Sequence, residues 1–327
     1  MIKKSSIKLA VLLIFLFGAA SAAWSQSYPV KPIRLVVPNP PGGGTDTMAR
    51  LISQKASPAL GQQIIVDNRP GGGGRIAADL VARAPKDGYT LMLGSVSSLI
   101  TGPALYPEQT NYDPAKDFSP ITTVATTAYL LAVHPSVPAK SVKDLIQISK
   151  VKKDRLTYGS TGSGSSAHLG MKLFESRTKI SLLHVPYKGS SSAMVALTSG
   201  EIDVMFGNYQ ATLGLVRAGR LRALAQSSLE RSQLATDIPT VSESGVPGFE
   251  LRQIYSVVAP AGVPEDIIRR LNQEIGKSLP AEDVKKLMAA KGIEITVSTP
   301  EALDKLLASQ RAVWTKVIRD AGIKAGR

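Results

Sequence analysis

Residues 33–50 constrain the fold more than any other part of the sequence. The stretch begins with the β-forming run Ile-Arg-Leu-Val-Val, continues through three prolines and three glycines, and ends in a helix-forming segment. Proline supplies no N–H to a sheet and ends the strand, while the glycines allow close approach of the backbone. Thr45 or Asp46 could then cap a helix that begins near Thr47. The stretch predicts a strand, a bare loop and a helix N-terminus.

A second loop of the same kind spans residues 158–169, where Ser-Thr-Gly-Ser-Gly-Ser-Ser separates a predicted strand from a helix beginning at Ala167. The N-terminus of a helix presents unpaired N–H groups and partial positive charge, which suit a carboxylate or a phosphate. Ser163, Ser165 and Ser166 could add hydroxyl hydrogen bonds. Two such loops in facing halves could hold one anion between them. A plain structural turn at the first loop and a serine-rich linker at the second are the alternatives.

The N-terminal segment has the pattern of a signal peptide. Lys3, Lys4 and Lys8 form a basic region, residues 9–17 are apolar, and small residues follow at positions 20–23. We expect residues 1–25 to be removed by cleavage between Ala22 and Ser25. The expected product is an exported, soluble protein.

Strands and helices alternate along the rest of the chain. Strands are expected at residues 33–37, 63–66 and 89–93, with helices between them, which is typical of a parallel sheet. Two further β-rich runs, residues 121–133 and 251–259, bracket a second such set, and two helices follow, at residues 265–279 and 301–321. We therefore expect an α/β protein with a ligand cleft between two mainly parallel sheets, each in its own domain. Domain 1 would comprise residues 26–124 and 253–327, and domain 2 residues 125–252, as in hinged binding proteins.

Composition excludes several classes of function. The sequence has no cysteine, which excludes disulfides, thiolate metal sites and a cysteine nucleophile. Its net charge of +14 comes from 39 Lys and Arg against 25 Asp and Glu, and loss of the three signal-peptide lysines leaves +11. The basic residues are scattered and aromatics make up only 5%, so nucleic acid is not an expected partner.

Catalytic and cofactor signals are weak. Gly72, Gly74 and Ala77 match a dinucleotide fingerprint, but the acidic residue expected about twenty positions later is missing. The three histidines, at positions 134, 168 and 184, are far apart in the sequence, so we expect no metal site, and a capping or core role for His168 and His184. A serine hydrolase based on residues 160–166 and His168 is an alternative, although the sequence has no Gly-x-Ser-x-Gly elbow. Asp203 is expected to be structural.

Many segments together resemble the substrate-binding receptors of tripartite tricarboxylate transporters, often called Bug-type receptors. The matching segments include Pro-Gly-Gly-Gly-Thr-Asp at residues 41–46, Asn-Arg-Pro-Gly-Gly-Gly-Gly at 68–74, Asp-Gly-Tyr-Thr-Leu at 87–91, Tyr-Gly-Ser-Thr-Gly-Ser-Gly-Ser-Ser-Ala-His-Leu at 158–169, and His-Val-Pro-Tyr-Lys-Gly at 184–189. They cover nearly all of the expected mature chain. The sequence departs from the family pattern at Asn39, where an aromatic residue is usual, at Gly207, where an acidic residue is common, and at Ile254-Tyr255-Ser256, where Trp-x-Gly is usual.

The resemblance implies a receptor located in the periplasm, with a two-domain, periplasmic-binding-protein-like (Venus flytrap) fold that closes over a small carboxylate and presents it to a membrane permease. It implies no enzymatic activity and no cofactor, and we expect a monomer. A receptor that signals to a sensor protein is an alternative. The resemblance maps the ligand-binding residues onto Asn39, Pro41, Gly43, Gly44, Thr45, Asp46, Ser95, Ser98, Ser160, Thr161, Gly162, Ser163, Ser165, Ser166, Tyr187, Lys188, Gly189 and Asn208. Asp46 would repel an anion, so it is expected to cap its helix, to order a water or to receive an amine, and Lys188 could offset its charge.

Overall fold

The computed structural model describes residues 28–42, 44–151, 156–187 and 189–323. The predicted signal peptide and two of the predicted site residues, Gly43 and Lys188, lie outside the described residues. Within the described residues no helix has the length and apolar character needed to cross a membrane.

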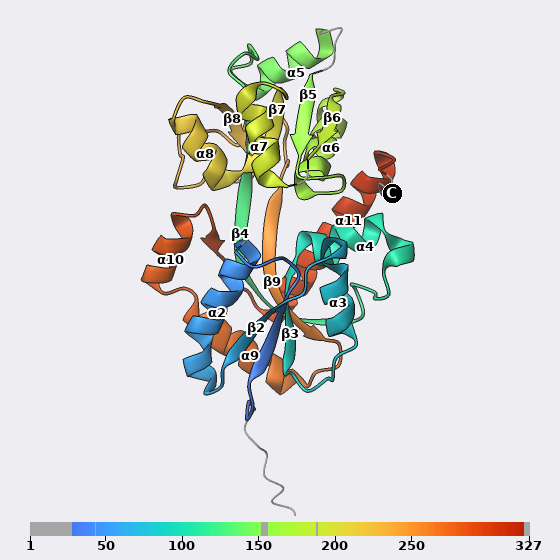
Figure 1. The fold of residues 1–327 in the computed structure, drawn as a ribbon, viewed down its shortest axis with the longest axis vertical. Helices are drawn as coiled ribbons and strands as arrows, with labels where there is room; N and C mark the ends of the chain where they lie inside the picture. Colours follow the sequence, from blue (N-terminus) through green and yellow to red (C-terminus); the bar gives the residue numbers. More distant parts are fainter. Residues whose placement is uncertain (1–27, 43, 152–155, 188, 324–327) are drawn as a thin grey trace, which may run out of the picture.

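Two groups of elements, which we call the first and second lobes, are joined by the long strands β4 (Phe118–Val133) and β9 (Arg252–Pro260) (Figure 1). We call these two strands the hinge. The expected boundaries at 124/125 and 252/253 fall inside β4 and at the start of β9. The exact division into domains stays a prediction.

The first lobe contains elements from both ends of the chain (Figure 1). Its N-terminal part contains β1 (Ile33–Val37), α2 (Gly44–Leu60), β2 (Ile64–Asn68), η1 (Gly72–Gly74), α3 (Arg75–Ala82), β3 (Thr90–Ser95), η2 (Ser97–Thr101), α4 (Gly102–Leu105) and η3 (Pro107–Gln109). Its C-terminal part contains α9 (Glu265–Ser278), α10 (Glu282–Ala289), β10 (Glu294–Ile295) and α11 (Pro300–Asp320).

The second lobe lies between the two hinge strands in the sequence. It contains α5 (Val142–Val151), β5 (Thr157–Ser160), α6 (Ser166–Thr178), β6 (Leu183–Pro186), α7 (Ser190–Ser199), β7 (Val204–Asn208), α8 (Tyr209–Arg217) and β8 (Arg222–Gln226). Helix α8, like α10 in the first lobe, has no counterpart among the helices expected from the sequence.

The expectation of two mainly parallel sheets is wrong, because the strands form one ten-stranded mixed sheet. Its main path is β2-β1-β3-β9-β4-β7-β5-β6, with a parallel block at each end and antiparallel pairs across the middle. Strand β4 explains this continuity, since its 16 residues pair with β9 over residues 118–128 and with β7 over residues 129–133. Main-chain hydrogen bonds therefore run through the hinge from one lobe to the other.

Two large apolar cores fix the lobes on the sheet. One core lies in the first lobe, between the sheet and helices α2 and α9, and includes Ile52 and Leu271. The other extends through both lobes and joins Val36 and Met92 of the first to Phe174 and Phe206 of the second. Because burial of such side chains contributes about 1.5–3 kcal/mol each, both cores can hold the sheet without disulfides.

Candidate functional site

The first glycine loop is held in place by the carboxylate of Asp46. Helix α2 begins at Gly44, three residues earlier than expected, so Asp46 lies in its first turn and the expected cap is wrong. One Asp46 oxygen accepts from the backbone N–H of Gly42 at 2.9 Å and from Arg50 Nε at 3.0 Å, and the other accepts from Asn68 Nδ2 at 3.1 Å. Arg50 is the main cause of the lowered Asp46 pKa, and burial opposes it. The carboxylate therefore stays ionised and braces the loop.

Asn68 is a site residue that the sequence analysis missed. Its amide also donates to the carbonyl of Asn39 at 2.9 Å, so it ties both ends of the first loop to the end of β2. Its only signal in the sequence is its place in the segment 68–74 that resembles the receptor family.

The second glycine loop rests on two histidines that are distant in the sequence. The rings of His168 and His184 are stacked with centroids 4.0 Å apart, and Tyr158 stacks on His184 at 4.8 Å. His168 Nδ1 accepts from the backbone N–H of Gly164 at 2.9 Å, and His184 Nε2 shares a hydrogen bond with Ser160 Oγ at 2.7 Å. His168 is buried, which confirms a core role for it, whereas His184 is only partly buried.

Burial is the main cause that lowers the pKa of His168 to about 3 and that of His184 to about 4. The positive charge of Lys172 lowers the pKa of both histidines further, and His184 also lowers the pKa of His168. Both imidazoles are therefore neutral at neutral pH. A neutral His168 with an unprotonated Nδ1 is the form that can accept from Gly164.

Tyr255 of β9 brings two of the predicted segments together in the first lobe. Its Cα pairs with that of Ser95 in the antiparallel ladder between β3 and β9. Its hydroxyl lies at the start of α2, since a Cβ added at Gly44 would be 3.0 Å from Tyr255 Oη. Ser95 and Ser98 are buried and hydrogen-bond one another, so they shape this end of the hinge rather than present free hydroxyls.

Tyr129 of β4 lies next to a predicted site residue of the second lobe. Its Cα pairs with that of Asn208, which caps the N-terminus of α8 by accepting from the Ala211 N–H. The Tyr129 side chain is partly buried and packs against the core that extends through both lobes. Tyr255 and Tyr129 thus each lie next to predicted site residues, although the sequence analysis did not identify them as site residues.

The remaining predicted residues fall into two groups. Ser160 is fully buried and bonded to His184 and Gly162, and Ser165 caps α6 by accepting from the His168 N–H, so both support the second loop. Ser163 is exposed, and Thr161, Gly162 and Ser166 are partly exposed. In the first lobe Thr45 is 8% exposed, and Pro41 and Gly44 are exposed.

Tyr187 and Gly189 lie next to the second loop. The Tyr187 N–H donates to the carbonyl of Ser160 at 3.0 Å, and Gly189 precedes α7. The Tyr187 hydroxyl donates to Glu201 at 2.7 Å; burial is the main cause, and this bond the next, of a Tyr187 pKa raised to about 12. The Tyr187 hydroxyl therefore already donates its hydrogen bond within the protein, to Glu201.

The arrangement at the hinge can be compared with known proteins. The family model described as the tripartite tricarboxylate transporter family receptor, TctC, matches residues 48–323. The chain belongs to this family. It is therefore a solute-binding receptor, and its family is not one of enzymes.

Full-length relatives support the TctC assignment. BugT of Bordetella pertussis is 36% identical over 319 residues, which cover 97% of this chain and 98% of BugT. A Rhodopseudomonas palustris protein, Rpa4515, solved with adipate, is 36% identical with a TM-score of 0.78, covering 91% of this chain and 99% of the other. MatC of the same organism, solved with malate, is 31% identical with a TM-score of 0.74, covering 89% and 100%. The fold is thus that of the TctC receptors.

The contact between Ser160 and His184 resembles a nucleophile and its base, yet it does not suit the hydrolase that we considered. Ser160 Oγ is fully buried, and the low pKa of His184 makes it a weak base. His168, the histidine that we considered as the base, is occupied by Gly164. As expected for a TctC receptor, this serine and these histidines hold a loop. Among the described residues no group of three side chains has the arrangement of a metal site.

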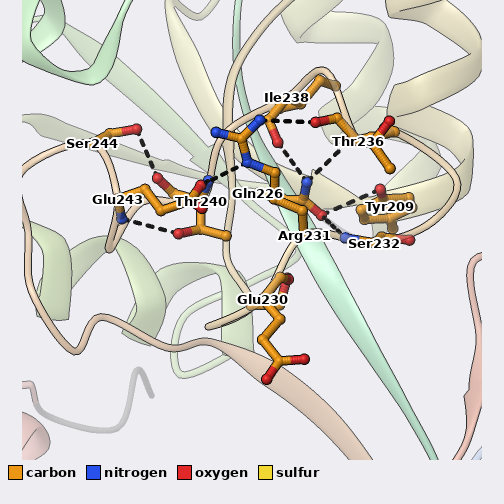
Figure 2. Close-up of polar contacts among 12 residues, drawn as sticks. Tyr209, Gln226, Glu230, Arg231, Ser232, Thr236, Ile238, Thr240, Glu243 and Ser244 are labelled. Carbon is orange, nitrogen blue, oxygen red and sulfur yellow. Dashed lines mark hydrogen bonds and ion pairs between the residues drawn. The ribbon is translucent and has the colours of Figure 1, made fainter.

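A separate groove of about 620 Å³ lies between the lobes, and no predicted site residue of the described chain lines it. Its walls come from residues 126–128, Tyr209, residues 228–234, Arg252, Lys285, Ala289 and residues 292–295. The buried Gln226 holds one wall, because its amide donates to the carbonyls of Ala235 and Ile238 and accepts from the Ser232 N–H (Figure 2).

Two charged residues of that wall point in different directions. Arg231 is turned back to the Thr236 carbonyl and the Glu243 carboxylate, while Glu230 points away from them (Figure 2). On the other side Arg252 pairs with Glu250 and lies 3.7 Å from Glu294. Arg231 and Arg252, two of the cations that line this groove, are thus paired with carboxylates of the protein itself.

Proposed function

We propose that this TctC receptor binds a small carboxylate between its lobes, at the N-termini of α2 and α6, and delivers it to a tripartite-type membrane permease. The observation that carries the proposal is that each lobe places a glycine loop directly before a helix N-terminus, that of α2 in the first lobe and that of α6 in the second. Each loop ends at a helix N-terminus, whose free N–H groups and dipole favour an anion.

The charge balance at the loops supports an anionic ligand. Among the described residues of the predicted site, Asp46 carries the only charge, and Arg50 neutralises it. Its remaining lone pairs accept from Gly42 and Asn68, so the carboxylate has no need of an amine from the ligand. A carboxylate bound to the backbone N–H groups would therefore meet little repulsion. With these partners Asp46 requires neither of the other roles that the sequence suggested, which were to order a water or to receive an amine.

The relatives give the chemical class of the expected ligand. Rpa4515 was solved with adipate and MatC with malate, both small carboxylates. We further propose that residues 1–25 direct export to the periplasm, where relatives of this chain act, and that β4 and β9 allow the lobes to close over the ligand. Closure would bring both helix N-termini onto one solute.

Calorimetry on the purified protein, after unfolding and refolding to remove copurified ligand, tests the binding step. A panel of succinate, malate, glutarate, adipate, citrate, aspartate and benzoate should contain at least one acid that binds with micromolar or better affinity. Absence of binding by every acid, with the refolded protein shown to be native, would contradict the proposal. Uptake of the bound acid by cells with and without the receptor gene would test delivery to the permease.

A further inference from the structure

A pocket of about 550 Å³ lies within the second lobe, and neither glycine loop lines it. It is bounded by the end of α8, the start of β8, the segment before α5 and the turn at residues 237–239. All of its lining residues belong to the second lobe, so its shape does not depend on how the two lobes are oriented.

The pocket lies along an edge of β8 that no other strand covers in the described chain. Strand β8 pairs with β4 along one side, over residues 222–226. On the other side its only pairing is at Gln226, which accepts from the Val241 N–H at 2.9 Å. The next donor of a parallel ladder would be the N–H of residue 239, and Pro239 has none. The edge at residues 222–224 is therefore left to line the pocket.

Three cations from three different segments line the pocket. Lys140 precedes α5, Arg217 ends α8 and Arg222 begins β8. The two guanidinium groups donate to main-chain carbonyls, at 2.8 Å from Arg217 and at 3.0 and 3.1 Å from Arg222. Such bonds orient a guanidinium without neutralising it. Within the described residues none of these three cations forms an ion pair.

Little negative charge faces these cations. Asp237 is the only acidic residue among the described residues that line the pocket, which leaves a lining charge of +2 at neutral pH. Asp144 accepts from the Lys140 backbone N–H at 2.9 Å and does not line the pocket. In the groove between the lobes, by contrast, Arg231 and Arg252 each pair with a carboxylate. The pocket of the second lobe therefore favours an anion more than that groove does.

The arrangement of the cations indicates the chemical class of the anion. A carboxylate has two oxygens in one plane, whereas a phosphate presents oxygens in several directions and carries up to two negative charges at neutral pH. Guanidinium groups suit these oxygens because they donate paired hydrogen bonds. The apolar wall of the pocket comes from Leu213, Val216, Leu221 and Ile238. The pocket is larger than a phosphate needs and has the volume of a small-molecule site, about 300–1,000 Å³.

We propose that this pocket is a second ligand site, where Lys140, Arg217 and Arg222 bind the phosphate group of a small organic phosphate whose body lies on the apolar wall. The inference goes beyond the proposed function and does not rest on it, because the pocket shares no lining residue with the glycine loops. The protein can therefore bind the organic phosphate and a carboxylate at the same time.

Calorimetry with phenyl phosphate as the probe, in a buffer without phosphate or citrate, tests the proposal. The pocket variant, Lys140→Gln/Arg217→Gln, removes two exposed cations and leaves Arg222, whose hydrogen bonds hold the segment before α5. The control, Arg83→Gln/Lys116→Gln, removes the same two kinds of charge from exposed positions in the first lobe. Urea unfolding of both variants checks that the fold is retained.

The wild type should bind phenyl phosphate saturably, and the pocket variant should bind it about tenfold or more weakly, as for loss of contacts to a charged group. The control should change the affinity by less than about twofold. Asp237→Asn removes the acidic lining residue and should strengthen binding about twofold. A damaged fold cannot produce this opposite effect, so Asp237→Asn keeps the test decisive if the pocket variant unfolds.

NMR titration of the isotope-labelled protein locates the probe. The backbone amides of Ala223 and Leu224, which line the pocket, should shift with phenyl phosphate and not with benzoate, in which a carboxylate replaces the phosphate. Equal shifts with benzoate would overturn the assignment to phosphates.

Three calorimetric results would overturn the site itself. They are no saturable binding of phenyl phosphate, equal losses in the pocket variant and the control, and unchanged binding by the pocket variant. None of them touches the proposed function, because the pocket variant should bind carboxylates as the wild type does. Failure of every acid in the carboxylate panel would reject the proposed function and leave this site standing.

Discussion

The two glycine loops at the hinge have similar sequences and are held in different ways. The first loop, residues 38–46, is braced by an ionised carboxylate, Asp46, with Arg50, Asn68 and the Gly42 N–H around it. The second loop, residues 160–166, is braced by two neutral imidazoles, His168 and His184. One loop therefore depends on a charge being present, and the other on a charge being absent.

The difference matters because the two supports respond to acid at different pH. The Asp46 pKa lies below its usual value, so this carboxylate contributes its stability above about pH 4 and loses it only at lower pH. The histidine pKa values lie below the unfolded value of about 6.5, so the histidines contribute fully above that pH. Their contribution is lost as the pH falls toward 4 and 3. Mild acid should loosen the second loop first.

The largest effect is expected from a change of pH from 7 to 5. Over this range each histidine is protonated in the unfolded chain but not in the folded one, which costs about 2 kcal/mol of unfolding free energy per histidine. Urea unfolding at both pH values measures the loss. His168→Gln keeps an acceptor for the Gly164 N–H and removes one titrating group, so it should lose about half as much. An unchanged free energy of unfolding at pH 5 would contradict the account of the second loop.

Asp46→Ala tests the support of the first loop. The substitution leaves the Gly42 N–H, the Asn68 amide and the Arg50 guanidinium without their shared acceptor, and we expect a loss of about 3 kcal/mol of unfolding free energy. Asp79→Ala breaks a comparable ion pair with Arg83 in the more exposed α3 and should cost less than about 0.5 kcal/mol. Thermal unfolding and calorimetry of both variants give the comparison. Equal effects of the two substitutions would show that the first loop does not depend on Asp46.

Gly164→Ala should destabilise the second loop by about 2 kcal/mol. The backbone φ of Gly164 is +78°, which L-residues rarely adopt, and an added Cβ would lie 2.5 Å from Leu105 Cδ1 of α4 in the other lobe. A double-mutant cycle with Leu105→Ala separates the two causes by urea unfolding. If the steric cause is real, the cost of Gly164→Ala falls to about 1 kcal/mol in the Leu105→Ala background.

Gly42→Ala should have the smallest effect, about 1 kcal/mol. Its φ of +87° is strained for alanine, but no atom lies within 4 Å of an added Cβ, so only the backbone strain counts. The same unfolding measurement applies. A cost larger than that of Gly164→Ala would reverse the comparison, since it would mean that the first loop is the more closely packed of the two.

Local patterns in the sequence were enough for most of the elements. The strand at residues 33–37 and the helix at residues 265–279 lie where the sequence indicates, to within one residue, because β-branched runs and helical apolar spacing are local signals. Helices α8 and α10 were missed, since each has only a short apolar spacing between polar segments. The continuous sheet was missed as well. It depends on the pairing of β4 with β9, whose residues are more than a hundred positions apart.

The site shows the same division between local and distant signals. Thr45, Asp46 and Ser160–Ser166 stand out in the sequence because glycine-rich turns before helices are recognisable. The bracing role of His184 and Asn68, and the position of the Tyr255 hydroxyl at the start of α2, come from contacts between distant parts of the chain. Asp203 is structural as expected, since its carboxylate accepts from the N–H and the hydroxyl of Thr157.

A crystal structure of the protein with the acid that binds best in calorimetry tests the central claim most directly. The account predicts a carboxylate within hydrogen-bonding distance of the backbone N–H groups at the start of α2, and contact of the same molecule with the loop before α6. Ligand density in the groove lined by Arg252 and Lys285, with both glycine loops unoccupied, would contradict it.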